Sequence, residues 1–507
     1  MGEPDWALSR REFIERTAYA AGLAGVAGLP LETLLAQQAQ ASIRSHRLPT
    51  PRNVPIDHFV LLMMENRSFD TYFGWLHGQA DGVQNQTYPD PQGNPVPTRS
   101  HSALGTGGTE WKGCGHPDPG HGWDNGRAQL NGGFLAPGSG NDILAMTYYN
   151  QGELGFLHEA AHKYTLYDRY FCSLLSSTYP NRYYKWSAQS GGKINNDPPV
   201  GSAGNQWETI FDRAIPRGVS ARYYASDLAF SAVWGARGAS WTNPISRYYD
   251  DCKAGTLPNI TIVDPPFKDG SGGDGNSADE HPLGDVRLGQ AFMADVVNAF
   301  VASPNYRRGA LFIVYDEWGG FFDHVRPPRV PDDRASRDLN TDFGQMGFRV
   351  PAVSVSPYTR APRTAKGFQV DHGIHGHESI LKLISYRFGL GALNRRHRYA
   401  RNIGHSFNWK RPDFDPPQLP DPPTITTAPC SLGGGDVQDS QQAHANDLAT
   451  LEALSERVGV PVYEGKPDQI FTKPDAVRKG LAAAKRRERR RQHAHAVAAA
   501  KKKHHRH

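Results

Sequence analysis

An unbroken run of six apolar residues, Phe59 to Met64, stops abruptly at Glu65-Asn66. An apolar run of this length without polar alternation is typical of a strand covered on both faces, as in the parallel sheet of an α/β protein. A second such run, Ala310 to Tyr315, ends in Asp316-Glu317. The two runs predict an α/β fold in which buried strands end in acidic and amide side chains.

Other apolar patterns predict the rest of the framework. We expect further strands at Ala221 to Tyr224, Asn259 to Val263 and Val350 to Ser356. Helical spacing of apolar residues predicts helices at 150–170, 181–189, 207–215, 285–302, 380–388 and 441–458. Between the first strand and these helices, residues 76–141 are rich in Gly, Pro, Asp and His, which indicates a long ordered loop.

The net charge of +5 is unevenly distributed along the 507 residues. Residues 485–507 hold ten Lys or Arg and one Glu, whereas residues 1–41 carry a net charge of −2, so the body of the chain is nearly neutral. A neutral body argues against specific nucleic-acid binding. The basic tail is either a solvated disordered segment or an electrostatic attachment to a membrane or anionic cell surface.

The N-terminus has the pattern of a twin-arginine signal peptide over residues 1–41. Arg10-Arg11 precede an Ala/Gly-rich apolar run, and Ala39-Gln40-Ala41 offers small residues for cleavage. The alternative is an ordinary short amphipathic helix. Because no segment approaches ~20 consecutive apolar residues, we expect an exported, soluble protein located outside the cell or in its envelope.

The four cysteines, at positions 114, 172, 252 and 430, suit an oxidising compartment. They allow three complete pairings, and the sequence does not choose among them. Because there is no C-x-x-C motif, a thiolate zinc site is not expected.

Thr178 lies in a segment suited to bind phosphate. Pro180 fits the first turn of a helix, which places Thr178 just before the helix N-terminus. Free backbone N–H groups and the positive end of the helix dipole point there, which favours an anion. The alternative is that Thr178 is an ordinary N-cap.

The ends of the two buried strands predict a metal site. Parallel strands bring Glu65, Asn66, Asp316 and Glu317 to one edge of the sheet. Three carboxylates packed together need a cation or raised pKa values. Oxygen donors favour Ca²⁺, Mg²⁺ or Mn²⁺, and such an ion next to Thr178 would lower the pKa of its hydroxyl. Nearby histidines would complete a site for phosphoryl transfer.

Three motifs carry a family resemblance: ENRSFD at 65–70, TYPNR at 178–182 and DEWGGFFDH at 316–324. Occurring in this order, they resemble the bacterial phosphoesterase family that includes phosphatidylcholine-hydrolysing phospholipases C and an exported acid phosphatase. The resemblance covers roughly residues 54–410. It implies an α/β/α sandwich with a largely parallel sheet, similar to the alkaline phosphatases.

The same resemblance assigns roles to individual residues. It implies that one divalent metal is held by Glu65, Asn66, Asp316, Glu317 and Thr178, and that Thr178 is the nucleophile that becomes phosphorylated. It places His121 and His281 at the phosphate as catalytic residues. It also implies that four further residues either contact the phosphate or support the residues that contact it: Asn181, Arg182, His324 and His377.

The resulting hypothesis is an exported, metal-dependent phosphoesterase of phospholipase C type. Its alternative is an acid phosphatase that uses the same site on small phosphate esters, and a remoter one is an inactive surface-binding protein. Aromatic residues in the loops, at 123, 148–149 and 183–184, are either candidates to hold a choline-like cation or part of the core, which is the commoner role of such residues. The expected division is a signal peptide (1–41), a catalytic domain (42–410), a linker (411–440), a helical extension (441–484) and a basic disordered tail (485–507).

Overall fold

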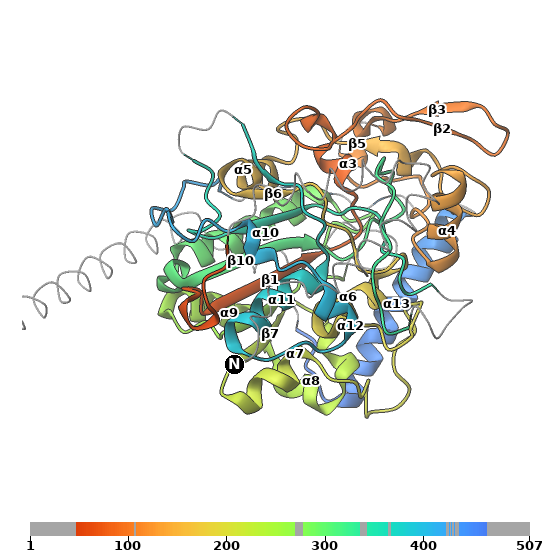
Figure 1. The fold of residues 1–507 in the computed structure, drawn as a ribbon. Coiled ribbons are helices and arrows are strands. Elements are labelled where there is room, and N and C mark those ends of the chain that lie inside the picture. The colour runs from red at the N-terminus through yellow and green to blue at the C-terminus, as the bar shows by residue number, and fades with distance from the viewer. Residues whose placement is uncertain are drawn as a thin grey trace, which may run out of the picture.

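The computed structural model describes residues 47–463, except 106–107, 269–276, 335–341, 363–366, 422–424, 426, 428–429 and 431–435. The predicted signal peptide and basic tail lie outside the described residues. One eight-stranded sheet runs through the molecule (Figure 1), in the order β12-β6-β11-β10-β1-β9-β7-β8.

The two apolar runs form neighbouring strands at the centre of this sheet. β1 (His58–Met64) lies between β10 (Gly309–Tyr315) and β9 (Ile260–Val263) and is parallel to both. The remaining strands of the sheet are β6 (Thr165–Tyr167), β7 (Ala221–Ala225), β8 (Thr242–Pro244), β11 (Ala352–Val355) and β12 (Gln369–Asp371). Only β11 runs antiparallel to its neighbours, so the prediction of a largely parallel α/β sheet is confirmed.

The register of β1 and β10 explains how distant sequence motifs meet. The pairing runs from His58 opposite Gly309 to Met64 opposite Tyr315, without an offset. The two strands therefore end together, and Glu65 and Asp316 follow at the same edge of the sheet. A shift by one residue would turn one of these side chains to the opposite face.

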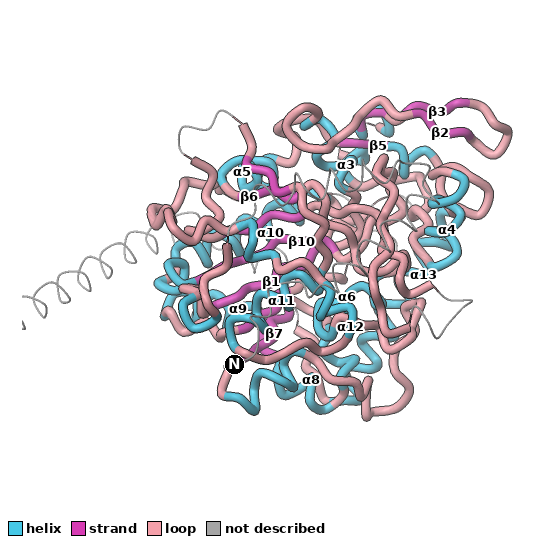
Figure 2. Tube along the Cα trace, viewed as in Figure 1, coloured by secondary structure: helices cyan, strands magenta, loops and turns pink. Residues whose placement is uncertain are grey.

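Helices cover both faces of the sheet, which makes three layers. On one face, Phe59 packs edge-on against Phe388 of α11 (His377–Phe388), with ring centroids 5.9 Å apart. On the other face, the hydroxyl of Tyr315 lies 4.0 Å from the sulfur of Met293 in α10 (Val286–Ala302). Figure 2 shows the strands inside this sandwich and long loops gathered near α4 and α13.

The other α-helices are α3 (Phe69–Phe73), α4 (Trp123–Gly132), α5 (Gly155–Lys163), α6 (Thr178–Ser187), α7 (Ile210–Ala214), α8 (Ala236–Trp241), α9 (Ile245–Ala254), α12 (Arg395–Tyr399) and α13 (Asp436–Val458). The 3₁₀ helices are η1 (Pro51–Asn53), η2 (Gly74–Leu76), η3 (His101–Leu104), η4 (Thr109–Trp111), η5 (Ile143–Met146), η6 (Ile215–Arg217), η7 (Phe230–Trp234), η8 (Pro304–Arg308) and η9 (Ile403–Ser406). Two small sheets pair β2 (Thr87–Pro89) with β3 (Pro95–Pro97), and β4 (Arg99–Ser100) with β5 (Thr147–Tyr148).

Several predicted helix boundaries are wrong, two of them for instructive reasons. The helix expected at 150–170 covers only 155–163, because Thr165-Leu166-Tyr167 enters the sheet as β6. β-Branched and aromatic residues favour a strand, and here the neighbouring strands outweigh the helical spacing of apolar residues. The C-terminal helix begins at Asp436, inside the stretch expected to be linker.

One disulfide, between Cys114 and Cys430, joins segments 316 residues apart. Cys172 and Cys252 are buried free thiols, so none of the complete pairings that the sequence allowed is present. Within the part of the chain that is described, no helix has the length and apolar character needed to cross a membrane.

Candidate active site

Three carboxylates and one arginine form the floor of the candidate site. Arg182 in α6 contacts Oε2 of Glu65 at 3.3 Å, Oδ1 of Asp264 at 3.2 Å and Oδ2 of Asp316 at 3.0 Å. Burial alone would lower the pKa of Arg182, but the three carboxylates outweigh burial and raise it. Arg182 therefore neutralises the strand ends and does not stand free to bind phosphate, as the sequence had allowed.

Asp264 is a residue of this floor that the sequence analysis did not assign. It directly follows β9 and also accepts hydrogen bonds from Lys185 and from the hydroxyl of Tyr223, both at 2.8 Å. The rule that identified Glu65 and Asp316, a carboxylate placed directly after a buried apolar strand, applies equally to Asp264.

The backbone at Asn66 orients Asp316. Asn66 has a left-handed conformation (φ 58°), which Asn tolerates better than most residues. Its N–H donates to Oδ1 of Asp316 at 3.1 Å, and the N–H of Glu317 donates to the same oxygen at 2.7 Å. A Cβ at Gly319 would lie 2.3 Å from the carbonyl oxygen of Asn66, so only glycine allows the two loops to approach this closely.

Buried oxygens at this edge lack partners. Within the described residues, both side-chain polar atoms of Asn66 and Oε1 of Glu317 have no hydrogen-bond partner. Burial raises the pKa of Asp316 to about 7, and burial together with Asp316 raises the pKa of Glu317 well above its usual range. A bound cation would give the unpaired oxygens a partner, and it would favour the ionised form of the buried carboxylates. The residues thus fit a hard divalent metal.

Thr178 lies against this cluster. It is the first residue of α6, which begins three residues earlier than predicted, and Ser177 is the N-cap residue. The Thr178 hydroxyl donates to Oε1 of Glu65 at 3.0 Å. Asn181, one turn further on, accepts from the N–H of Leu174 at 2.9 Å and donates to the carbonyl of Ser176 at 2.7 Å. Asn181 therefore holds the loop that presents Thr178.

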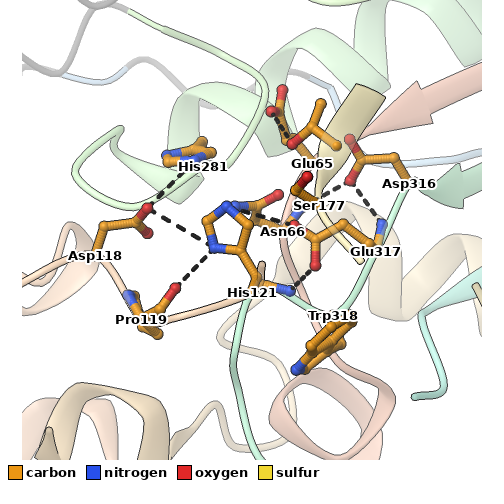
Figure 3. A network of polar contacts seen from close by, with 12 residues as sticks. Glu65, Asn66, Asp118, Pro119, His121, Ser177, His281, Asp316, Glu317 and Trp318 are labelled. Atoms are coloured by element: carbon orange, nitrogen blue, oxygen red, sulfur yellow. Dashed lines mark hydrogen bonds and ion pairs between the residues drawn. The ribbon is translucent and has the colours of Figure 1, made fainter. Parts of the chain in front are cut away.

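His121 and His281 face the site with defined ring orientations (Figure 3). Nδ1–H of His121 donates to Pro119 O at 2.7 Å, and Nδ1–H of His281 donates to Pro282 O at 2.6 Å. Each Nε2 is consequently left as an acceptor. Burial lowers the pKa of His121 to about 4 and that of His281 well below its usual range, so both rings are neutral at pH 7.

Asp118 completes the histidine side of the site and was missed by the sequence analysis. Its Oδ2 lies 3.7 Å from Nε2 of His281, while Nε2 of His121 lies 3.9 Å from Oε1 of Glu317. Asp118, His121 and His281 each offer one ligand atom within 4.8 Å of the others. Asp118 stands three residues before His121 in the loop rich in Gly, Pro and His, which is the signal that could have found it.

A pocket of about 220 Å³ lies over these residues. Its floor and one side include Glu65, Thr178, Arg182, His121 and His281. The aromatic residues that line it are Tyr179, Phe230 and Phe267. None of the candidate aromatic residues at 123, 148–149 and 183–184 lines this pocket: Tyr149, Tyr183 and Tyr184 are buried in the core, as their alternative role predicted, and Arg127 covers the ring of Trp123.

Comparison with known proteins identifies the family. The sequence profile of the Phosphoesterase family matches residues 56–391, most of the described chain. The chain belongs to this family. A non-hemolytic phospholipase C of Burkholderia pseudomallei is 30% identical over 500 residues, covering 82% of this chain and 67% of the relative. A phospholipase C B of Mycobacterium tuberculosis is 29% identical over 490 residues, covering 81% and 89%.

A plant relative shows the same similarity. Non-specific phospholipase C4 of Arabidopsis thaliana is 30% identical over 432 residues, covering 76% of this chain and 77% of the relative. A solved structure in the alkaline phosphatase superfamily, from Vibrio parahaemolyticus, has a TM-score of 0.32 and 10% identity, covering 84% of this chain and 96% of that one. Its likeness is too weak to carry an argument. The family and its phospholipase C members establish the chain as a hydrolase of phosphoric ester bonds.

Two predicted histidines of this phosphoesterase lie outside the pocket. Nε2–H of His377 donates to the backbone carbonyl of Asp316 at 2.8 Å, so this residue supports the strand end from behind. His324 contacts Oδ2 of Asp70 at 2.6 Å and Oδ1 of Asp81 at 3.2 Å, in a separate ionic network that includes Arg349. His324 thus stabilises the loop after β10 and is not placed to contact substrate.

The network around His324 predicts a pH-dependent stability. Burial lowers its pKa, but hydrogen bonds with Asp70 and Asp81 outweigh burial and raise it to about 9. A histidine whose pKa is raised on folding stabilises most below its unfolded pKa of about 6.5, and this contribution is lost as pH rises through about 9. His324→Gln should therefore lower the urea midpoint at pH 6 more than at pH 10. An equal loss at both values would contradict the charged state of His324.

Proposed function

We propose that this chain is a metal-dependent phospholipase C-like phosphodiesterase in which Thr178 forms a covalent phospho-threonine intermediate. The observation that carries the proposal is the Thr178 hydroxyl, 3.0 Å from Oε1 of Glu65, at the start of α6 and beside a cluster of buried, unpartnered oxygens. The relatives named phospholipase C support a phospholipid as the substrate.

The chain's own residues suggest how the two steps proceed. Glu65 accepts the hydrogen bond of Thr178, which orients Oγ1 for attack on phosphorus and provides the first acceptor for its proton. As the bond from Oγ1 to phosphorus forms, the bond from phosphorus to the departing alcohol breaks, and the alcohol takes up this proton. A divalent ion held by Glu65, Asn66, Asp316 and Glu317 would stabilise the charge on the phosphoryl oxygens and lower the pKa of the Thr178 hydroxyl. In the second step, the unprotonated Nε2 atoms of His121 and His281 are acceptors for a proton of the attacking water, whose oxygen bonds to phosphorus as the bond from phosphorus to Oγ1 breaks. The proton then returns to Oγ1 of Thr178.

Export by the twin-arginine route is also a proposal. It rests on Arg10-Arg11, the apolar run and the small residues at 39–41, and the Cys114–Cys430 disulfide agrees with an oxidising compartment. We expect an Arg10→Lys, Arg11→Lys double variant to stay in the cytoplasm, which cell fractionation measures.

The basic tail is proposed to contact anionic groups of a membrane or cell surface. Deletion of residues 485–507 should then abolish binding of the protein to anionic vesicles.

Substrate and metal dependence are tested together. The purified chain should hydrolyse p-nitrophenyl phosphorylcholine faster than p-nitrophenyl phosphate. Chelation should lower both rates by about 100-fold or more, because the acidic cluster then lacks its cation, and Ca²⁺, Mg²⁺ or Mn²⁺ should restore them. A faster monoester rate would favour the acid phosphatase alternative. No turnover with any metal would favour the surface-binding protein.

A further inference from the structure

The C-terminal helix α13 forms one wall of the pocket, although it lies beyond residues 56–391 that the family profile matches. Its residues on this wall are Ala443, His444, Asp447, Leu448 and Leu451. The ring of His444 stacks on His281, with centroids 3.9 Å apart and an interplanar angle of 18°. The helix expected to be a separate extension therefore touches a predicted catalytic residue.

Several contacts fix α13 in this place. Leu451 and Leu454 are buried in the core, and Lys268 pairs with Glu452 at 2.6 Å. The disulfide joins Cys430, shortly before α13, to Cys114, shortly before the loop that carries Asp118 and His121. These contacts hold α13 in the folded site, where it packs against η7.

Asn196 connects Asp447 to the nucleophile's helix. Its Oδ1 accepts from the N–H of Tyr179 at 2.9 Å, and its Nδ2 donates to Oδ2 of Asp447 at 2.8 Å. The amide thereby holds the Asp447 carboxylate close to the residue that follows Thr178. Asp447 is half-buried and lines the pocket.

This wall carries one carboxylate, Asp447, which has no ion-pair partner from Lys or Arg among the described residues. Arg182 is engaged by three carboxylates, and Lys268 pairs with Glu452. A phosphate group alone would be repelled by Asp447. A substrate that carries a cation beyond its phosphate would instead find an opposite charge there.

Aromatic rings complete the wall. Tyr179 and Phe230 also line the pocket and form an edge-to-face pair with centroids 5.1 Å apart. Aromatic faces attract ammonium groups, and an adjacent carboxylate adds to this attraction. We expect Phe267 to attract an ammonium group less, because the guanidinium of Arg182 already lies 4.7 Å from its ring centroid.

We propose that Asp447 is a specificity-determining residue that selects phosphate diesters carrying an ammonium group on one alcohol, with Tyr179 and Phe230 beside it. The proposal rests on the proposed phosphodiesterase function. It assigns the phosphate to the Thr178 side of the pocket and the cationic alcohol to α13.

The test compares a cationic with an uncharged second substituent. Asp447→Asn keeps the shape and can still accept from Asn196. We expect it to lower kcat/KM for p-nitrophenyl phosphorylcholine about tenfold, mainly through KM, and to leave bis(p-nitrophenyl) phosphate unchanged or faster. Asp447→Glu should retain the preference for the cationic ester. Glu456→Gln removes the same charge from an exposed position of α13 and should change neither rate.

Other results would overturn the assignment. Equal losses on both esters would mean that Asp447 only supports the fold, and no loss on either would remove it from recognition. If the wild type turned over neither ester, the proposed function would fail. Calorimetric binding of phosphorylcholine to wild type and Asp447→Asn would then still decide the role of Asp447, with about tenfold weaker binding by the variant expected and equal affinity contradicting it.

Discussion

Replacing Thr178 with alanine is expected to lower kcat on p-nitrophenyl phosphorylcholine by about 10³-fold or more, the usual scale for loss of a nucleophile. The substitution removes the hydroxyl that lies 3.0 Å from Oε1 of Glu65 and changes little else, because Asn181 still holds the loop. Acid-quenched wild type should carry the phosphorylcholine group that remains after p-nitrophenol leaves, detectable by intact-mass spectrometry, and Thr178→Ala should not.

Matched variants at the same helix start separate the nucleophile from its surroundings. Ser177→Ala removes the hydroxyl of the preceding residue, which makes no capping hydrogen bond to the helix. This variant should keep a turnover close to that of the wild type. Thr178→Ser keeps a hydroxyl and should retain part of the activity. Near-normal turnover by Thr178→Ala, or its loss in Ser177→Ala, would move the nucleophile away from Thr178.

Replacing Arg182 with methionine is expected to lower the free energy of unfolding by about 3–5 kcal/mol, the scale for removing one partner of a buried ion pair. Arg182 is fully buried and lies within 3.3 Å of Glu65, Asp264 and Asp316, so the variant leaves three carboxylates short of positive charge. Urea unfolding with a chelator present measures the loss. Added divalent metal should recover part of it by binding the folded state.

A surface pair provides the control for Arg182. Arg308 pairs with Asp57 on the surface, where the Arg308 side chain is 57% exposed. Arg308→Met should cost less than about 1 kcal/mol, because water screens exposed ion pairs. Similar losses for Arg182→Met and Arg308→Met would show that Lys185, 2.8 Å from Asp264, compensates the cluster when Arg182 is absent.

Much of the acidic cluster at the strand ends could be predicted from local sequence. An unbroken apolar run of this length is typical of a strand buried on both faces, and such strands end in loops that carry polar groups. Glu65-Asn66 and Asp316-Glu317 follow from this rule, and the unshifted register of β1 and β10 brings them together. Asp264 obeys the same rule, but it belongs to a shorter strand and to none of the three family motifs.

Residues on loops were harder to place. His121 and His324 are both loop histidines near polar motifs, yet His121 faces the pocket and His324 lies between Asp70 and Asp81. A one-dimensional pattern carries no information about which way a loop turns after it leaves the sheet. The aromatic residues show the same limit, since the sequence left both roles open and only the structure places Tyr183 and Tyr184 in the core and Tyr179 of the same helix at the pocket.

The sequence by itself determined the α/β class and the oxygen-rich ends of β1 and β10, because these depend on residues close together in the chain. Thr178 became the candidate nucleophile through the resemblance of its motif to the family. Only the tertiary structure decided that Arg182 neutralises the carboxylates, that Asp118 joins His281 and that α13 closes the pocket with His444 and Asp447. These contacts join segments that are far apart in the sequence, and packing of the whole core sets them.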